Sequence, residues 1–409
     1  MPGPLEGIKV VECNRVAPGS LATVLLADMG ADVVRVVEPG PPDADVGDGG
    51  DGGSGGPQEA EKRRRRAGFW VDRNKRSLSL DLKKPEAQEA LRRLAAQADV
   101  LVEGFRPGVM QRLGADYDTL SALNPRLVYC SLSGFGQDGP YRDFPAHDIN
   151  YLSLAGVLNQ LGQPGEAPTI PLNLVADYAG ASMHGALGVM FALFARERTG
   201  RGQLVDVSYL DATISLLCAV PSFMAFLGGG PEPRRGVGTF DGSRPYYTTY
   251  ECADGKLLSI GSTEPHLWHN FCDAVDRPDW RAAELTRGEA MRGPRPEQAA
   301  VKLEVAALLR TKPRDEWYDL LTKADVCVGK VYDPHEVFED PQVRHRGMAL
   351  ELDVDGAAAM NPGVAIKLSQ TPGSVRFPTP RAGAHTDEIL GSLGYSGDDI
   401  ASLRAAGAI

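Results

Sequence analysis

Two side chains able to exchange protons near neutral pH lie 30 residues apart in the sequence. His147 opens the segment His147-Asp-Ile-Asn-Tyr151, and Asp177 lies beside a run of small residues. An imidazole and a carboxylate on opposite sides of one carbon could take a proton from one face and return one to the other, which is racemisation. Each residue also has a structural alternative, since a lone histidine is more often structural and a carboxylate at a helix start is commonly an N-cap.

Three arginines, Arg35, Arg106 and Arg112, lie in, or close behind, predicted strands. In open α/β sheets, ligands bind at the carboxyl ends of the strands. A guanidinium can hold two phosphate oxygens at once, so these positions favour a phosphate-bearing ligand. Ordinary ion pairing at the surface is the alternative.

The first half of the chain alternates strand-like and helix-like segments, which must position these residues. Apolar β-branched runs predict strands at 8–12, 33–37, 100–102 and 127–131, and helical spacing marks 18–29 and 85–97. Such alternation predicts a Rossmann-like parallel sheet with helices on its faces. The first strand leads into Cys13–Gly19 without a GxGxxG pattern, which argues against a nicotinamide or flavin site.

The second half predicts a smaller α+β domain. Strand-like runs at 245–250 and 256–260 flank Asp254-Gly255, a hairpin signal, and helical patterns follow near 266–275, 298–310 and 314–322. Beyond about 350, extended Pro-rich segments lead to helices near 386–393 and 397–406. We therefore expect a large domain over 1–210, a linker at 211–234, a small domain over 235–340, and a return to the large domain over 350–409. A Gly/Asp-rich insertion at 40–67 is expected to be a flexible loop.

The composition fits a soluble globular protein, with 409 residues, 43% hydrophobic, and a net charge of −11. That charge argues against nucleic-acid and anionic-membrane partners. Six scattered cysteines without metal-ligand spacing indicate reduced thiols in a cytoplasmic protein and no metal site. No run of about 18 uninterrupted apolar residues is present, so no membrane span is expected.

Longer motifs across nearly the whole chain resemble family III CoA transferases, and within them the α-methylacyl-CoA racemases. The broad family is marked by residues 7–12, 26–35, 74–83, 104–108, 132–137 and 385–390. The racemase branch is marked by 147–151, by 171–178, and by 245–250 with Glu264-Pro265.

This resemblance implies proton transfer at the α-carbon of an acyl-CoA thioester. His147, oriented by Glu264, would serve one face of that carbon and Asp177 the other. The enolate oxygen would be held by the backbone N–H of Asp148. Glu264 by itself has the character of a surface turn residue. CoA is part of the substrate, and no cofactor is required.

The resemblance also assigns CoA binding to Arg35, Arg112 and the segment Leu78, Ser79, Leu80 and Asp81; Arg106, Asn150 and Tyr151 are further candidates. Two residues depart from relatives, with Glu38 where an arginine is frequent and Ala146 where glycine is usual. The arginine run Arg63–Arg66 in the insertion could replace the lost contact. Relatives are interlocked homodimers, so Glu264 would reach His147 of the other subunit.

Other functions use the same residues. Family III CoA transferases move CoA between an acyl-CoA and a carboxylate, with an aspartate matching Asp177 as nucleophile. The histidine separates the two, because acyl transfer needs no second base opposite the carboxylate. Double-bond isomerisation or epimerisation of a special acyl-CoA would use both bases. A non-catalytic CoA-binding protein is the remaining alternative.

Overall fold

The computed structural model describes residues 2–14, 17–40, 65–286, 289, 293–354 and 356–409. The chain divides into two compact units, the first formed by Met1–Tyr151, Asn173–Ala212 and Phe338–Ile409, the second by Leu152–Leu172 and Thr213–Val337. Residues 152–172, expected in the large domain, and residues 213–234, expected in the linker, group with the second unit. Most of the predicted insertion, 41–64, lies outside the described residues.

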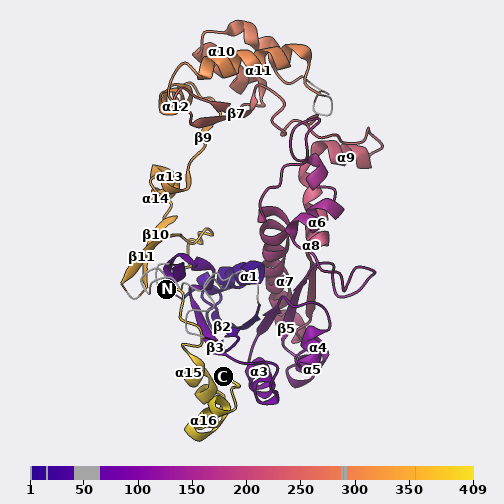
Figure 1. The fold of residues 1–409 in the computed structure, drawn as a ribbon, viewed down its shortest axis with the longest axis vertical. Coiled ribbons are helices and arrows are strands. Elements are labelled where there is room, and N and C mark those ends of the chain that lie inside the picture. Colours follow the sequence, from indigo (N-terminus) through magenta and orange to yellow (C-terminus); the bar gives the residue numbers. More distant parts are fainter. Residues whose placement is uncertain (1, 15–16, 41–64, 287–288, 290–292, 355) are drawn as a thin grey trace, which may run out of the picture. The chain divides into compact units, whose positions relative to one another are not determined.

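A six-stranded parallel sheet forms the centre of the first unit (Figure 1). Its strands lie in the order β3-β2-β1-β4-β5-β6, with bounds β1 Lys9–Cys13, β2 Asp32–Val37, β3 Lys75–Ser79, β4 Val100–Glu103, β5 Val128–Ser133 and β6 Leu204–Ser208. The four strands expected from apolar runs are confirmed. The two edge strands, β3 and β6, were missed because charged and polar residues interrupt their apolar pattern. The strand order reverses between β1 and β4, which is where open α/β sheets bind ligands.

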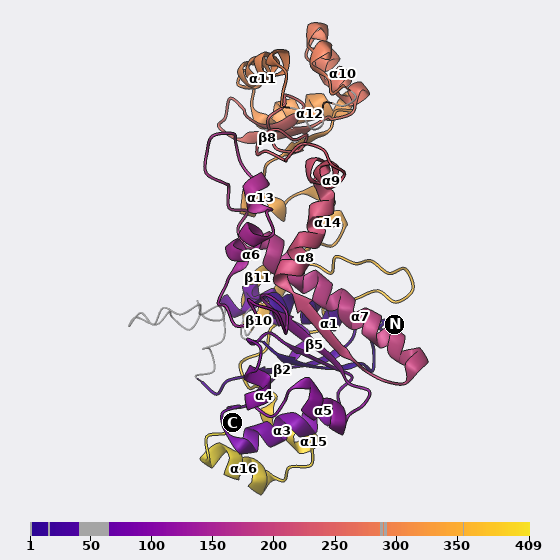
Figure 2. The same cartoon turned by 90° about the vertical axis from the view of Figure 1, so that its right-hand side faces the viewer.

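Helices cover both faces of this sheet (Figures 1 and 2). One layer packs α1 against α7, and the other joins α3, α5, α15 and α16 in one apolar core. The bounds are α1 Ala17–Asp28, α3 Pro85–Ala96, α4 Val109–Arg112, α5 Tyr117–Leu123, α7 Met183–Thr199, α14 Pro341–His345, α15 Thr386–Ser392 and α16 Gly397–Ala405, with a hairpin of β10 Ala349–Val354 and β11 Ala357–Pro362. The predicted α/β class is confirmed.

The C-terminal segment completes the outer edge of β3. The N–H groups of Ser77 and Ser79 donate to His385 Nδ1 at 3.1 Å and Thr386 Oγ1 at 3.0 Å. The His385 N–H in turn donates to the Ser77 carbonyl at 3.0 Å. An exposed strand edge would otherwise present unpaired backbone groups.

One continuous helical run, Leu174–Thr199, is long and apolar enough to cross a membrane by length and composition, and a bent pair at 209–227 passes the same test jointly. This differs from the expectation of no candidate span. The helix contacts α1, β5 and β6 of the sheet domain, and core helices of soluble proteins share these properties.

The second unit is built on a three-stranded antiparallel sheet of β7 Tyr247–Glu251, β8 Leu257–Gly261 and β9 Val328–Lys330. Gly255 has φ +74° in the turn between β7 and β8, a conformation that favours glycine, and the predicted hairpin is confirmed. Stacked rings of Trp268, Phe271 and Trp280 anchor its core. Its helices are α9 Pro221–Leu227, α10 Pro265–Ala274, α11 Pro296–Leu309, α12 Arg314–Lys323 and α13 Pro334–Val337, while α6 Asp148–Leu154 and α8 Tyr209–Ser215 run from one unit into the other.

Candidate active site

His147 lies directly before α6, on a tightly bonded turn. Its carbonyl accepts from the N–H groups of Asn150 at 2.8 Å and Tyr151 at 3.3 Å, and its own N–H donates to Asn150 Oδ1 at 3.0 Å. The residue is exposed. Asn150 therefore fixes the backbone that carries His147, and its predicted contact with CoA stays a prediction.

Asp177 lies in a π-helix, η3 (Leu174–Ser182), that continues into α7. π-helical turns are rare and frequently occur at functional sites. The carboxylate is half-buried and accepts a hydrogen bond from Asn173 Nδ2 at 3.3 Å. The backbone carbonyl of Asp177 accepts from Ser182 Oγ at 2.8 Å.

Burial raises the pKa of Asp177 to about 6. The Asn173 hydrogen bond opposes this rise, the negative charge of Asp148 adds to it, and the charge of His147 opposes it. The charges of His147 and Asp148 therefore both act on the Asp177 carboxyl group. A carboxyl group with a pKa near 6 can serve as base or acid close to neutral pH.

The buried Asp148 carboxylate links the backbone at His147 to the backbone at Asp177. Asp148 Oδ2 accepts from the N–H groups of Ala176 at 2.8 Å and Asp177 at 2.9 Å. Asp148 is only 4% exposed. A carboxylate that accepts the free N–H groups of a helical first turn stabilises that turn. Since Asp148 adjoins His147 in the chain, it fixes the backbone at one base relative to the backbone at the other.

Tyr151 supports the same turn through its hydroxyl and its ring. The hydroxyl donates to the Ala146 carbonyl at 3.0 Å, and the ring packs edge-on against Phe135 and Tyr209. Burial raises the pKa of this phenol to about 12, with Asp177 adding to the rise and Arg106 opposing it. The charge of Arg106 thus acts near the turn that carries His147. Tyr151 is a positioning residue here, and its contact with CoA stays a prediction.

A cavity of about 670 Å³ opens at the carboxyl ends of β1, β2 and β4. Among its lining residues are Arg35, Leu80 and Arg106, three of those predicted to bind CoA, together with Lys83 and Glu38. Lys83 Nζ lies 3.8 Å from Glu38 Oε1, so a lysine supplies positive charge beside the position where the resemblance led us to expect arginine. Leu78 and Arg112 do not line this cavity.

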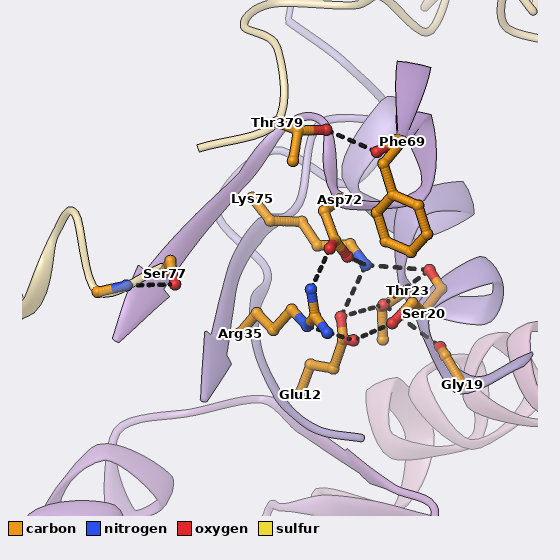
Figure 3. A network of polar contacts seen from close by, with 11 residues as sticks. Glu12, Gly19, Ser20, Thr23, Arg35, Phe69, Asp72, Lys75, Ser77 and Thr379 are labelled. Carbon is orange, nitrogen blue, oxygen red and sulfur yellow. Dashed lines mark hydrogen bonds and ion pairs between the residues drawn. The ribbon is translucent and has the colours of Figure 1, made fainter. Parts of the chain in front are cut away.

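Arg35 belongs to a buried ionic network (Figure 3). Its guanidinium pairs with Asp72, and its Nε lies 3.6 Å from Glu12 Oε1. Lys75 Nζ lies 2.8 Å from Glu12 and 3.4 Å from Asp72, and Ser20 Oγ donates to Glu12 at 2.6 Å. Burial would raise the pKa of Glu12, but the charges of Lys75 and Arg35 lower it to about 2. The network holds Arg35 at the cavity wall, which limits its freedom to fold around a phosphate.

The segment Leu78–Asp81 contributes differently along its length. Leu78 is fully buried in the core, and Ser79 donates its N–H to Thr386. Asp81 caps the following turn, accepting from the Lys83 N–H at 3.1 Å, and donates its own N–H to the Ala408 carbonyl at 2.8 Å. Only Leu80 of this segment lines the cavity. Side-chain contact with CoA is therefore not supported for Leu78.

Glu103 ends β4 as a second buried carboxylate that sequence reasoning did not single out. It accepts from the Phe105 N–H at 2.8 Å and from Ser131 Oγ, which itself accepts from Gln137 Nε2 at 2.7 Å. Burial raises the pKa of Glu103 to about 7. Glu12 and Glu103 each place a carboxylate at or near the end of an apolar strand, and that shared pattern could have revealed them.

We expect Glu103→Gln to stabilise the protein at alkaline pH. The folded protein binds the proton of Glu103 more tightly than the unfolded chain does. The stability that this proton contributes is full below pH 4.5, the pKa in the unfolded chain, and is lost as pH rises through about 7, the pKa in the folded protein. In urea unfolding at pH 8.5, the free energy of unfolding of the variant should exceed that of the wild type by on the order of 1–3 kcal/mol, and this difference should shrink towards pH 5. Glu86→Gln, at an exposed position on α3, is the matched control. A gain of equal size at both pH values would contradict this account.

Glu264 lies in the second unit, after β8, at the N-terminal end of α10. Its carboxylate accepts from Thr263 Oγ1 at 3.0 Å and is exposed. Its predicted role in orienting His147 stays a prediction. Of the arginine run, Arg63 and Arg64 lie outside the described residues, Arg65 is exposed, and Arg66 is buried with 1% of its surface exposed. A contact of the run with CoA stays a prediction.

The sequence as a whole matches one protein family. The model of CoA-transferase family III matches residues 5–386. The chain belongs to CoA-transferase family III. The match covers nearly the whole chain.

The similar proteins include racemases and CoA transferases. The chain is 36% identical to the alpha-methylacyl-CoA racemase of Homo sapiens over 405 residues, 98% of this chain and 96% of that protein. It is 33% identical to an acyl-CoA transferase of Fusarium pseudograminearum, over all of this chain and 88% of that protein. A CaiB/BaiF family protein from Brucella suis has a similar structure, with a TM-score of 0.77 at 28% identity, covering 96% of this chain and all of that one.

Proposed function

We propose that this enzyme interconverts the 2-methyl epimers of acyl-CoA thioesters by moving the α-proton between two bases. The observation that carries the proposal is the joint placement of His147 and Asp177, linked through Asp148, with the pKa of Asp177 raised to about 6. Transfer of an acyl group would require the aspartate alone. The similarity to alpha-methylacyl-CoA racemase supports the same reaction.

In one direction, the ionised Asp177 carboxylate removes the α-proton from the carbon next to the thioester. The C–H electron pair moves into a C–C double bond, and the carbonyl electrons move onto the thioester oxygen to give an enolate. The His147 imidazolium then delivers a proton to the opposite face, and the enolate electrons form the new C–H bond. The reverse direction exchanges the two roles, so atoms and charges balance without any further reactant.

The enolate oxygen requires a hydrogen-bond donor held in place before the reaction. We assign this to the backbone N–H of Asp148, whose side chain is already fixed on η3. Loss of such a donor typically costs roughly 2.7–4 kcal/mol in the transition state. Burial and, to a smaller extent, the negative charge of the same side chain raise the pKa of Asp177, so that its carboxylate is basic enough to deprotonate a weak carbon acid.

The CoA portion is proposed to occupy the 670 Å³ cavity, with its phosphates near Arg35, Lys83 and Arg106. No hydrogen bond or ion pair of the Arg106 guanidinium to a described residue is present, so this side chain is available to a phosphate. Arg106 also acts electrically on Tyr151, beside the catalytic turn. We propose that a ligand bound in the cavity passes this side chain on its way towards His147 and Asp177.

The deciding experiment incubates one epimer of a 2-methylacyl-CoA with the enzyme in heavy water. We expect one deuterium to appear at the α-carbon while the other epimer forms. NMR and mass spectrometry measure both changes. The competing reaction, CoA transfer, is tested in the same samples by adding an unrelated carboxylic acid. Formation of its CoA thioester with no α-deuterium would replace the racemase proposal by the transferase one.

We further propose that the enzyme works as a homodimer. An apolar stripe on α7 is exposed, consisting of Met183 (49%), Leu187 (48%), Met190 (38%), Phe191 (64%) and Phe194 (67%). These residues recur at three- and four-residue spacing, so they form one face of the helix. Such a patch marks an interaction surface. A second copy is the occupant we propose, with its Glu264 orienting His147.

Replacing Phe191 and Phe194 by serine is therefore expected to shift the protein from dimer to monomer and to lower activity in parallel, as measured by analytical ultracentrifugation and epimer assay. Leu123→Ser, an exposed position on α5, is the control. Co-expressed His147→Ala and Glu264→Gln chains should recover activity, because one of the two sites in a mixed dimer is then intact. An active monomer, or wild-type protein that binds phosphatidylcholine vesicles through this stripe, would overturn the dimer proposal.

A further inference from the structure

Asn14 presents a buried amide that is not satisfied within the protein. It directly follows β1 and is only 5% exposed. Neither Nδ2 nor Oδ1 has a hydrogen-bond partner among the residues that the structure describes. Leaving a buried donor and a buried acceptor unpaired is costly, and native proteins rarely do so without a reason.

Asn14 is among the residues that line the 670 Å³ cavity, and its amide lies against two glycines. Asn14 lines the cavity together with Cys13 and Gly104. A Cβ atom at Gly104 would lie 2.8 Å from Asn14 Oδ1, and one at Gly19 would lie 2.4 Å from Nδ2. Side chains at these positions would displace the amide. The local sequence therefore makes room for Asn14 while giving it no partner.

Its place in the sheet is that of a ligand-binding residue. Asn14 follows β1 and Gly104 follows β4, the neighbouring strands at which the strand order reverses. Ligands of open α/β sheets bind in the crevice at this point. The amide thus lies at the end of the sheet where the cavity begins.

Asn14 also lies on the side of the cavity that leads to the catalytic aspartate. It abuts Gly19, and the carbonyl of the adjacent Pro18 accepts from Ser182 Oγ at 2.7 Å. The same Ser182 hydroxyl lies 2.8 Å from the Asp177 carbonyl. A CoA thioester with its phosphates at Arg35 and Lys83 and its α-carbon at Asp177 would therefore bring its pantetheine arm past Asn14.

We propose that the Asn14 carboxamide recognises the pantetheine arm, donating from Nδ2 to an amide carbonyl and accepting at Oδ1 from an amide N–H. This inference rests on the proposed acyl-CoA substrate. Pantetheine supplies both a donor and an acceptor, whereas ionised phosphates only accept and an acyl chain does neither. The adenine and ribose also offer donors and acceptors, but they lie beyond the phosphates from the thioester. Pantetheine is therefore the part of the substrate that would pass Asn14 and can satisfy both of its unpaired atoms.

The test uses Asn14→Leu, which keeps the branched shape of the side chain and removes both polar atoms. Binding of CoA, measured by calorimetry, is expected to weaken about 5- to 100-fold. Binding of 3′-phosphoadenosine 5′-diphosphate, which lacks pantetheine, should change less than about twofold. The melting temperature of the ligand-free variant should rise by about 2–6 °C, since an unsatisfied buried amide is replaced by hydrocarbon.

Opposite signs for stability and CoA binding distinguish recognition from a structural role, which would lower both. Asn14→Ser, which retains one donor and acceptor in a smaller side chain, should lose less CoA affinity than Asn14→Leu. Equal CoA affinity in wild type and Asn14→Leu, or parallel weakening of CoA and the nucleotide, would overturn the inference. Failure of the wild-type protein to bind CoA would instead refute the proposed substrate, so the two failures are separable.

Discussion

Asp177→Asn and His147→Ala are each expected to lower epimer interconversion by roughly 10²- to 10⁴-fold, the usual range for loss of one proton-transferring group. Interconversion needs both bases, because one proton leaves a face of the α-carbon and another arrives at the opposite face. The measurement is the rate of appearance of the second epimer from a pure one. Asp143→Asn, an exposed carboxylate on the loop before His147, is the matched control and should retain activity.

The two variants should differ in heavy water. Without His147, Asp177 can still remove and return a proton on its own face, so one epimer gains deuterium without inverting. Without Asp177, the opposite epimer should gain deuterium without inverting. A transferase gives another outcome, since Asp177→Asn would abolish CoA transfer and His147→Ala would spare it. Loss of all exchange for both epimers in both variants would contradict independent bases on opposite faces.

Asp148→Ala is expected to lower turnover by about 10²-fold with a much smaller change in CoA affinity. The substitution releases the N–H groups of Ala176 and Asp177, which Asp148 holds at 2.8 and 2.9 Å. A shift of a catalytic group by about 1 Å can cost that much in rate. Turnover and CoA binding, measured separately, test this, because general unfolding of the site would weaken both.

Asp148→Asn adds a pH-dependent test of the same residue. Asp177 must be ionised to act as a base, so the rate in that direction falls as pH falls through about 6. The charge of Asp148 contributes to this raised pKa. Removing that charge should therefore shift the acidic limb of the pH–rate profile, where the rate falls, to lower pH. The amide introduced by this substitution still offers one acceptor oxygen to the two N–H groups, so turnover should suffer less than in the alanine variant. An unmoved limb would show that Asp148 acts only through position.

Local sequence patterns were sufficient for the framework that carries the site. The apolar runs at 33–37 and 100–102 correspond to β2 and β4, and Asp254-Gly255 correctly indicated the hairpin of the second unit. These features depend on the alternation and turn preferences of neighbouring residues. β3 was missed because Lys75 interrupts its apolar pattern. The buried ammonium group of Lys75 pairs with Glu12 and Asp72, which both lie outside β3.

The sequence by itself determined the family, the parallel sheet and the candidate pair His147 and Asp177, because these are carried by contiguous motifs and local periodicity. The tertiary structure alone decided how that pair is held. The contact of Asp148 with the Asp177 backbone spans 29 residues, and the unpaired state of Asn14 depends on Gly104, distant in sequence. Burial and hydrogen-bond satisfaction are set by which segments meet in space, and single-sequence patterns do not encode those meetings directly.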